Sequence, residues 1–137
     1  MSGDSDIARS VPNLLLVENH APLRTLWNDV LGDLGFTVTT AESGDQAQEI
    51  IKGGTPIDVV FSDIRMPGQL DGLQLAGWVR KHYPWVIIVL QTGSLDDLPT
   101  EFRILRKPFT ASDFLKSLQE AMQARDRLVP SGGLIGA

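Results

Sequence analysis

Short apolar runs alternate with segments of helical periodicity along most of the chain. Five runs have the length of buried strands: 14–17, 36–39, 57–61, 86–90 and 102–105. Apolar runs of this length that alternate with helical patterns are typical of βα units arranged around a parallel sheet. The pattern therefore predicts an α/β protein with five parallel strands.

Helices are predicted between these runs. Apolar residues recur at helical spacing over 23–34, and Gly35 follows where a left-handed turn would end the helix. Ser43 can cap a second helix that ends at Gly53. A third helix is expected over about 72–82 because Pro84 follows it.

The ends of the chain differ from its middle. A last helix is expected to begin at Thr110, since Asp113 three residues later can complete a capping box. Residues 1–12 and 126–137 show little periodicity and are expected to be flexible tails. The folded domain is accordingly predicted to span residues 13–125.

Composition narrows the possible functions. A chain of 137 residues with 42% hydrophobic residues can build one core. The absence of cysteine excludes disulfides, thiolate catalysis and cysteine zinc sites. The net charge of -5 argues against a nucleic-acid partner. No apolar run has membrane-spanning length and no signal-peptide core is present, so a cytoplasmic protein without membrane contact is expected.

Chemically useful side chains follow four of the five runs. Glu18 and Asn19 come after the first run, Asp63 after the third, Thr92 after the fourth and Lys107 after the fifth. Ligands of parallel α/β sheets bind at the carboxyl ends of the strands, where these side chains would meet. An acid, metal-binding oxygens, a hydroxyl and an ammonium together suit phosphoryl transfer to a carboxylate.

Roles can be assigned on this hypothesis. Asp63 is the expected nucleophile, and Glu18 and Asn19 would help it to hold Mg²⁺. Thr92 and Lys107 would neutralise the phosphoryl oxygens. Each residue also has an ordinary structural interpretation: Glu18 and Asn19 can cap the first helix, Thr92 can bond to the backbone, and Lys107 can be solvated.

Several motifs contain these residues. They read Leu-Leu-Leu-Val-Glu-Asn from Leu14, Ser-Asp-Ile-Arg-Met-Pro-Gly from Ser62, Asp-Gly-Leu from Asp71, Gln-Thr-Gly from Gln91 and Lys-Pro-Phe from Lys107. In this order the set resembles the receiver domain of response regulators over about residues 13–125.

The resemblance implies a flavodoxin-like, doubly wound sheet with strand order 2-1-3-4-5. It further implies Asp63 as the phosphoacceptor, Thr92 as the switch hydroxyl, Lys107 as the conserved lysine and a cis Lys107–Pro108 bond. Mg²⁺ would bind to Glu18, Asn19, Asp63 and the backbone carbonyl of Arg65.

The resemblance also implies a role in signalling. A histidine kinase or phosphotransfer protein would phosphorylate Asp63, and a downstream protein would read the result. The domain would not be an enzyme beyond its own phosphorylation and dephosphorylation.

Three features depart from the family pattern. Asn19 replaces the aspartate that usually binds the metal, which should weaken Mg²⁺ binding. Ile104 replaces the aromatic residue that swings inward on activation. The segment between Thr92 and Lys107 is short and contains Pro99, so the fourth helix is expected to be shortened. This form resembles receivers associated with hybrid sensor kinases.

Other functions fit less well. A dinucleotide-binding fold needs a glycine-rich turn after the first strand, and a Walker lysine motif is also missing. Aspartate-based phosphatases need a second acid two residues after the nucleophile, where this chain has Arg65. A pseudo-receiver that binds partners without being phosphorylated remains the alternative, because of Asn19 and Ile104.

Overall fold

The computed structural model describes residues 11–94, 98–99, 101–128, and within this part it contains five parallel strands. Their order is β2-β1-β3-β4-β5, as expected for a flavodoxin-like fold. The strands are β1 (Asn13–Val17), β2 (Thr37–Ala41), β3 (Val59–Asp63), β4 (Ile87–Thr92) and β5 (Arg103–Arg106). The predicted fold class and strand order are confirmed.

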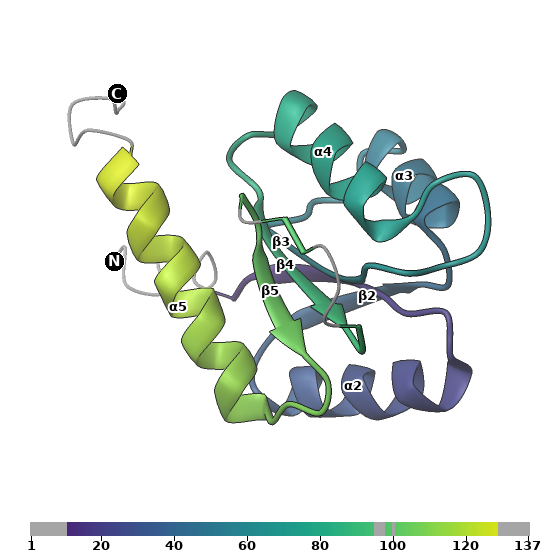
Figure 1. Ribbon diagram of the computed structural model, residues 1–137, viewed down its shortest axis with the longest axis horizontal. Coiled ribbons are helices and arrows are strands. Elements are labelled where there is room, and N and C mark those ends of the chain that lie inside the picture. Colours follow the sequence, from purple (N-terminus) through teal and green to yellow (C-terminus); the bar gives the residue numbers. More distant parts are fainter. Residues whose placement is uncertain (1–10, 95–97, 100, 129–137) are drawn as a thin grey trace, which may run out of the picture.

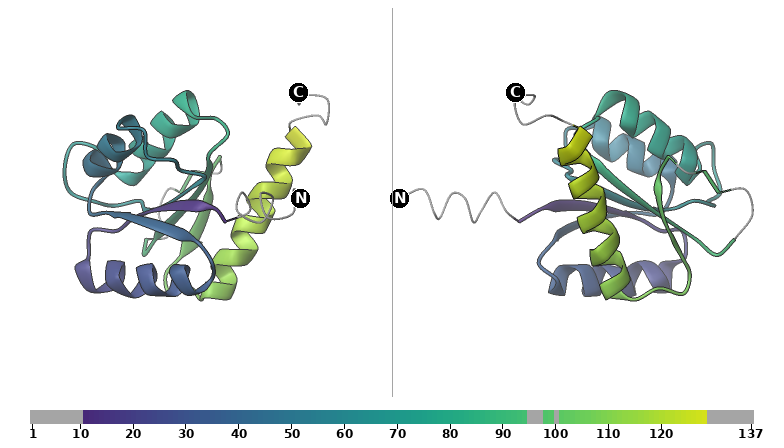
Figure 2. Two further views of the ribbon diagram at one scale, coloured as in Figure 1. Left: turned by 180° about the vertical axis from the view of Figure 1, so that it is seen from behind. Right: turned by 60° about the vertical axis from the view of Figure 1, so that its left-hand side comes forward.

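Helices cover both faces of the sheet. Helices α2 (Ala21–Asp33) and α5 (Ala111–Leu128) lie on one face, and α3 (Gly44–Lys52) and α4 (Gly72–His82) lie on the other (Figures 1 and 2). The core on the side of α2 and α5 buries Leu16, Phe61 and Val89 of the sheet together with Phe114 of α5. The opposite face forms a second core around residues such as Val60 and Leu90. The crossovers thus make a three-layer domain in which the carboxyl ends of all five parallel strands lie at the same edge of the sheet.

Local sequence signals account for several helix boundaries. The Ser43 Oγ accepts a hydrogen bond from the Gln46 backbone N–H at 3.1 Å. At the start of α5, the Asp113 carboxylate accepts from the Thr110 N–H at 2.9 Å, and the Thr110 hydroxyl accepts from the Asp113 N–H at 3.0 Å. Gly35 has a φ of 107°, which few residues other than glycine adopt. These predictions are confirmed.

The central strands differ from their predicted limits. β3 begins at Val59, and the preceding Asp58 is tied to β1 by its side chain, which accepts a hydrogen bond from the Asn13 N–H at 2.7 Å. The same strand continues to Asp63, which pairs with Gln91 on β4. β4 in turn continues to Thr92, which pairs with Arg106. Asp63 and Thr92 are therefore the last residues of rigid strands rather than the first residues of loops.

The remaining differences concern the connections. Between β4 and β5 none of the described residues 93–94, 98–99 and 101–102 is helical, in agreement with a shortened fourth helix. Helix α5 continues to Leu128, three residues beyond the expected end of the domain at 125. The predicted tails fall mainly on 1–10 and 129–137, which lie outside the described residues. No helix in the described part is long and apolar enough to cross a membrane.

Candidate functional site

The side chains singled out in the sequence come together at the carboxyl edge of the sheet. Asp63 ends β3, Thr92 ends β4, Glu18 follows β1, and Lys107 follows β5. Glu18 and Thr92 are each 2% exposed and Asp63 is 9% exposed. Polar groups as deeply buried as these need partners or a ligand.

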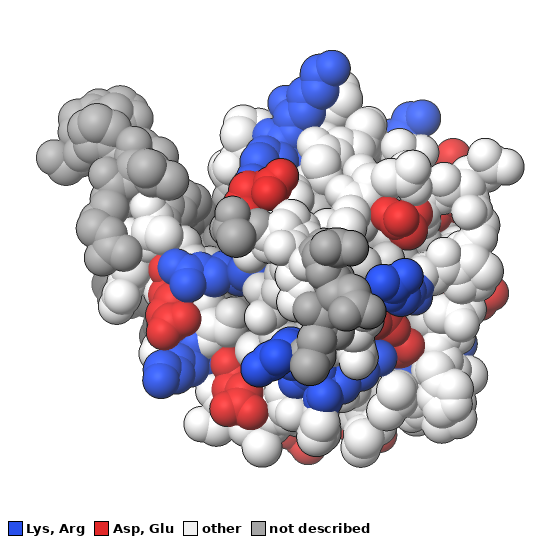
Figure 3. All heavy atoms as spheres, viewed as in Figure 1, with Lys and Arg blue, Asp and Glu red and all other residues white. Residues whose placement is uncertain are grey.

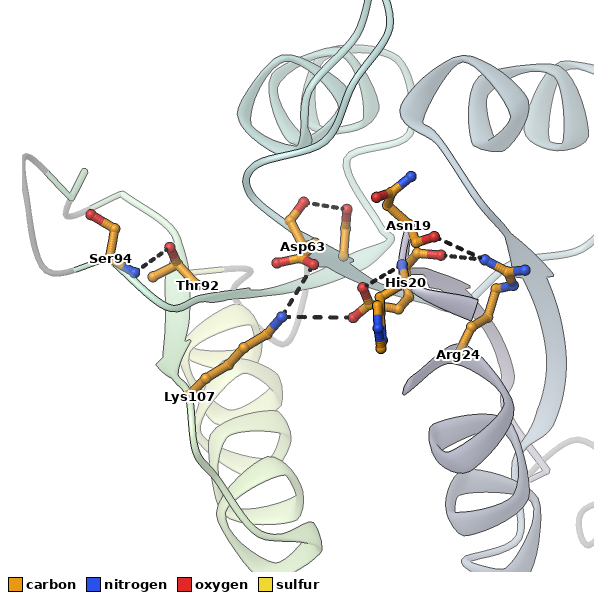
Figure 4. Close-up of polar contacts among 9 residues, drawn as sticks. Asn19, His20, Arg24, Asp63, Thr92, Ser94 and Lys107 are labelled. Atoms are coloured by element: carbon orange, nitrogen blue, oxygen red, sulfur yellow. Dashed lines mark hydrogen bonds and ion pairs between the residues drawn. The ribbon is translucent and has the colours of Figure 1, made fainter. Parts of the chain in front are cut away.

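Lys107 joins the two carboxylates. Its Nζ lies 3.2 Å from Asp63 Oδ2 and 3.8 Å from Glu18 Oε1 (Figure 4). One ammonium thus faces two largely buried acids, while the lysine side chain itself is 30% exposed. The negative charge of the pair is only partly neutralised.

Burial and this charge imbalance together raise the pKa of Asp63. Burial, followed by the charge of Glu18, raises the pKa of Asp63 from 3.8 to about 6, although Lys107 acts in the opposite direction. Both causes disfavour the charged form of the carboxyl. A cation beside Asp63 would restore the carboxylate that a nucleophile requires.

The donor set fits a magnesium ion. Glu18 Oε1 is buried and has no hydrogen-bond partner among the described residues, with the Lys107 ammonium 3.8 Å away, so it is an acceptor that a cation could use. Mg²⁺ takes only one or two carboxylates and keeps several waters. The described residues contain no group of three or more His, Asp or Glu side chains suited to a metal, consistent with Asn19 in place of an acid.

The other expected ligands lie at the rim. The Asn19 side chain is exposed and extends away from the Lys107 ammonium (Figure 4). Arg65 is also exposed, and the metal role of its carbonyl stays a prediction. Asn19 does not cap α2: the N-cap is His20, which makes no side-chain cap bond. The helix begins one residue later with Pro22 in its first turn, where a missing N–H costs nothing.

Thr92 lies at the same edge with its hydroxyl engaged elsewhere. Its Oγ1 accepts a hydrogen bond from the Ser94 backbone N–H at 3.1 Å (Figure 4). A hydroxyl that accepts one hydrogen bond keeps its own hydrogen, so the Thr92 O–H can still donate to a group on Asp63. The structure therefore places Thr92 near the acid without a direct contact.

The turn that carries Lys107 is firmly held. Its backbone N–H donates to the Thr92 carbonyl at 2.8 Å, and the Lys107–Pro108 bond is cis, as the resemblance implied. Phe109 stacks on Trp27 of α2 with ring centroids 4.9 Å apart. The backbone hydrogen bond and the Phe109 contact hold the turn from which the Lys107 side chain extends.

Two further residues support the site and were missed in the sequence. Arg24 Nη1 donates to the Glu18 carbonyl at 2.8 Å and to the Asn19 carbonyl at 3.4 Å. The Gly72 N–H donates to the Ile64 carbonyl at 2.8 Å, and a methyl group on Gly72 would overlap the carbonyl oxygen of Asp63. Two sequence features could have indicated these residues. Arg24 is a basic residue one turn into α2, and Gly72 directly follows Asp71, the N-cap residue of α4.

A doubly wound sheet with two acids and a lysine at its carboxyl edge defines a receiver-like α/β domain. The family model for the response regulator receiver domain matches residues 14–119. The chain therefore belongs to the receiver domain family of two-component response regulators.

Similar proteins occur in several signalling contexts. The chain is 28% identical to the DNA-binding transcriptional regulator NtrC of Klebsiella pneumoniae over 88% of this chain and 29% of NtrC. It is 32% identical to the sensor kinase CckA of Brucella abortus over 82% of this chain and 13% of CckA. The chain thus spans less than a third of these curated relatives.

Solved structures show the same fold. A response regulator receiver protein from Sinorhizobium medicae superposes with a TM-score of 0.76 at 32% identity, covering 85% of this chain and 98% of the other. The response regulator TrrA from Thermotoga maritima, in complex with Mg²⁺ and beryllofluoride, gives a TM-score of 0.72 at 26% identity. That match covers 81% of this chain and 99% of TrrA.

Proposed function

We propose that this domain accepts a phosphoryl group on Asp63 from a phosphohistidine of a histidine kinase or phosphotransfer protein. An oxygen of the Asp63 carboxylate attacks phosphorus, an O–P bond forms, and the P–N bond to the partner's imidazole breaks. The observation that carries the proposal is the contact of the Lys107 ammonium with the buried carboxylates of Asp63 and Glu18.

The geometry supports distinct roles for the residues. Asp63 is held at the end of a central strand, which fixes the nucleophile for attack. Lys107 can follow the negative charge from the carboxylate to the phosphoryl oxygens, and Thr92 can donate its hydroxyl hydrogen to them. Such donors stabilise the charge of the transferred group in the transition state.

Magnesium completes the proposed chemistry. Glu18 and Asp63 would hold Mg²⁺, with Asn19 and the Arg65 carbonyl contributing neutral oxygens. The bound ion supplies positive charge that keeps Asp63 ionised and neutralises the phosphoryl oxygens. The similar TrrA structure holds Mg²⁺ and beryllofluoride, which supports this assignment.

The output is proposed to pass through a protein partner, with no separate enzymatic activity. Basic and acidic side chains are interspersed on the face that carries α5 (Figure 3), and the net charge is -5. A nucleic-acid partner needs a basic surface, and neither the mixed charges on this face nor the negative net charge of the chain fits that need. The similarity to part of CckA supports a place beside a sensor kinase. The cytoplasmic location stays a prediction.

A pseudo-receiver is the second candidate, and Asn19 is the observation that favours it. Acetyl phosphate with Mg²⁺ distinguishes the two candidates by intact mass. We expect the wild type to gain one phosphoryl mass and the Asp63→Asn variant to gain none. A folded wild type that gains no mass, and shows no spectral change with beryllofluoride and Mg²⁺, would establish the pseudo-receiver.

A further inference from the structure

Gln91 has a buried amide that nothing in the proposed chemistry uses. Its side chain is 1% exposed, and its Nε2 has no hydrogen-bond partner among the described residues. A buried donor without an acceptor costs about 1–3 kcal/mol, and an apolar side chain of the same shape avoids that cost. Within the described part of the chain, the other buried side-chain atom without a hydrogen-bond partner is an acceptor, Glu18 Oε1, which faces Lys107.

The register of the sheet places Gln91 beside the phosphoacceptor. Asp63 on β3 pairs directly with Gln91, and Gln91 pairs with Leu105 on β5. Paired residues of neighbouring strands project to the same face. That face is the one toward α2 and α5, since Val89, two residues before Gln91, belongs to its core.

Lys107 has to cross this position to reach Asp63. It follows β5, and β4 lies between β5 and β3. Its Nζ nevertheless lies 3.2 Å from Asp63 Oδ2, so its side chain spans the width of β4. Gln91 therefore lies on the strand that this ion pair spans, and its side chain projects to the same face as that of Asp63.

We propose that Gln91 is a positioning residue for the modified Asp63, an inference that rests on the proposed phosphoacceptor function. When Asp63 carries a phosphoryl group or beryllofluoride, the ammonium of Lys107 moves toward the added charge. The carboxyl oxygen that it leaves then accepts a hydrogen bond from the Gln91 amide. The buried donor thus acquires its partner in the modified state.

Beryllofluoride with Mg²⁺ provides the test. Gln91→Met keeps the length of the side chain and removes the donor, and Leu90→Met alters the adjacent buried residue on the opposite face of β4. We expect Gln91→Met to weaken beryllofluoride binding roughly fivefold, as the loss of one hydrogen bond predicts. Its resistance to urea should be equal to or greater than that of the wild type. Leu90→Met should bind as the wild type does.

The wild type supplies a measurement that needs no variant. The side-chain amide resonances of Gln91 should shift on addition of beryllofluoride, and their exchange with water should slow. Unshifted Gln91 resonances, or wild-type affinity in Gln91→Met, would overturn the role of Gln91 and leave the phosphoacceptor function standing. A wild type that does not bind beryllofluoride would overturn both.

Discussion

Replacing Asp63 by asparagine should stabilise the metal-free protein at neutral pH. Asparagine has nearly the same shape and no charge. The wild-type site holds two buried carboxylates against one ammonium, and burial together with the charge of Glu18 raises the pKa of Asp63 to about 6. A group whose charged form is disfavoured in the folded state lowers stability wherever it is ionised.

The magnitude follows from the pKa in the two states. Below about pH 3.8 the carboxyl is protonated in both states and makes no difference. Between pH 3.8 and about 6 the folded protein keeps a proton that the unfolded chain loses, so stability falls as the pH rises. At about 1.4 kcal/mol per pH unit, the difference is about 3 kcal/mol above pH 6. Screening by solvent at the rim of the site reduces this to about 1–2 kcal/mol.

Urea unfolding in EDTA at several pH values between 4 and 8 measures the effect. The advantage of Asp63→Asn over the wild type should be close to zero at pH 4, grow through pH 5 and become constant above about pH 6.5. Asp29→Asn makes the same chemical change at an exposed position of α2 and should show no comparable growth. An Asp63→Asn variant that is less stable than the wild type at pH 7.5, or a difference independent of pH, would refute the reasoning.

Three further substitutions test the surroundings of Asp63. Asn19→Asp should raise Mg²⁺ affinity roughly tenfold in a fluorescence titration, because it restores a charged ligand; an unchanged affinity would contradict the assignment of Asn19 to the metal site. Gly72→Ala should cost about 2–3 kcal/mol in urea unfolding, because its methyl group overlaps the Asp63 carbonyl. Gly77→Ala in the same helix meets no atom within 4 Å and should be neutral or stabilising. Arg24→Met should weaken Mg²⁺ binding roughly fivefold, because the carbonyls of Glu18 and Asn19 lose their donor; calorimetry would measure it.

Features with local causes could be predicted from the sequence. Ser43 and the pair Thr110 and Asp113 bond to backbone within three residues, so their caps depend on nothing distant. Gly35 ends α2 through its own φ angle. The polar residues after the apolar runs could be placed at one edge because all five strands are parallel.

Features that depend on partners distant in the sequence could not be predicted. The ends of β3 and β4 are set by the pairing of Asp63 with Gln91 and of Thr92 with Arg106. Arg24 looks like any exposed basic residue of a helix until its contact with the Glu18 carbonyl is known. The start of α2 was misjudged by one residue, because its N-cap is His20, with Pro22 in the first turn, and Asn19 lies outside the cap position.

Asn19 is best understood through the charge balance of the metal-free site. With Asn19, two carboxylates share the single ammonium of Lys107, and burial together with the charge of Glu18 already raises the pKa of Asp63. An aspartate at position 19 would add a third negative charge, which should raise that pKa further and lower the stability of the metal-free protein. The same charge would strengthen Mg²⁺ binding. The asparagine therefore favours a domain that stays folded without the ion and binds it less tightly, and both effects should reverse together in Asn19→Asp.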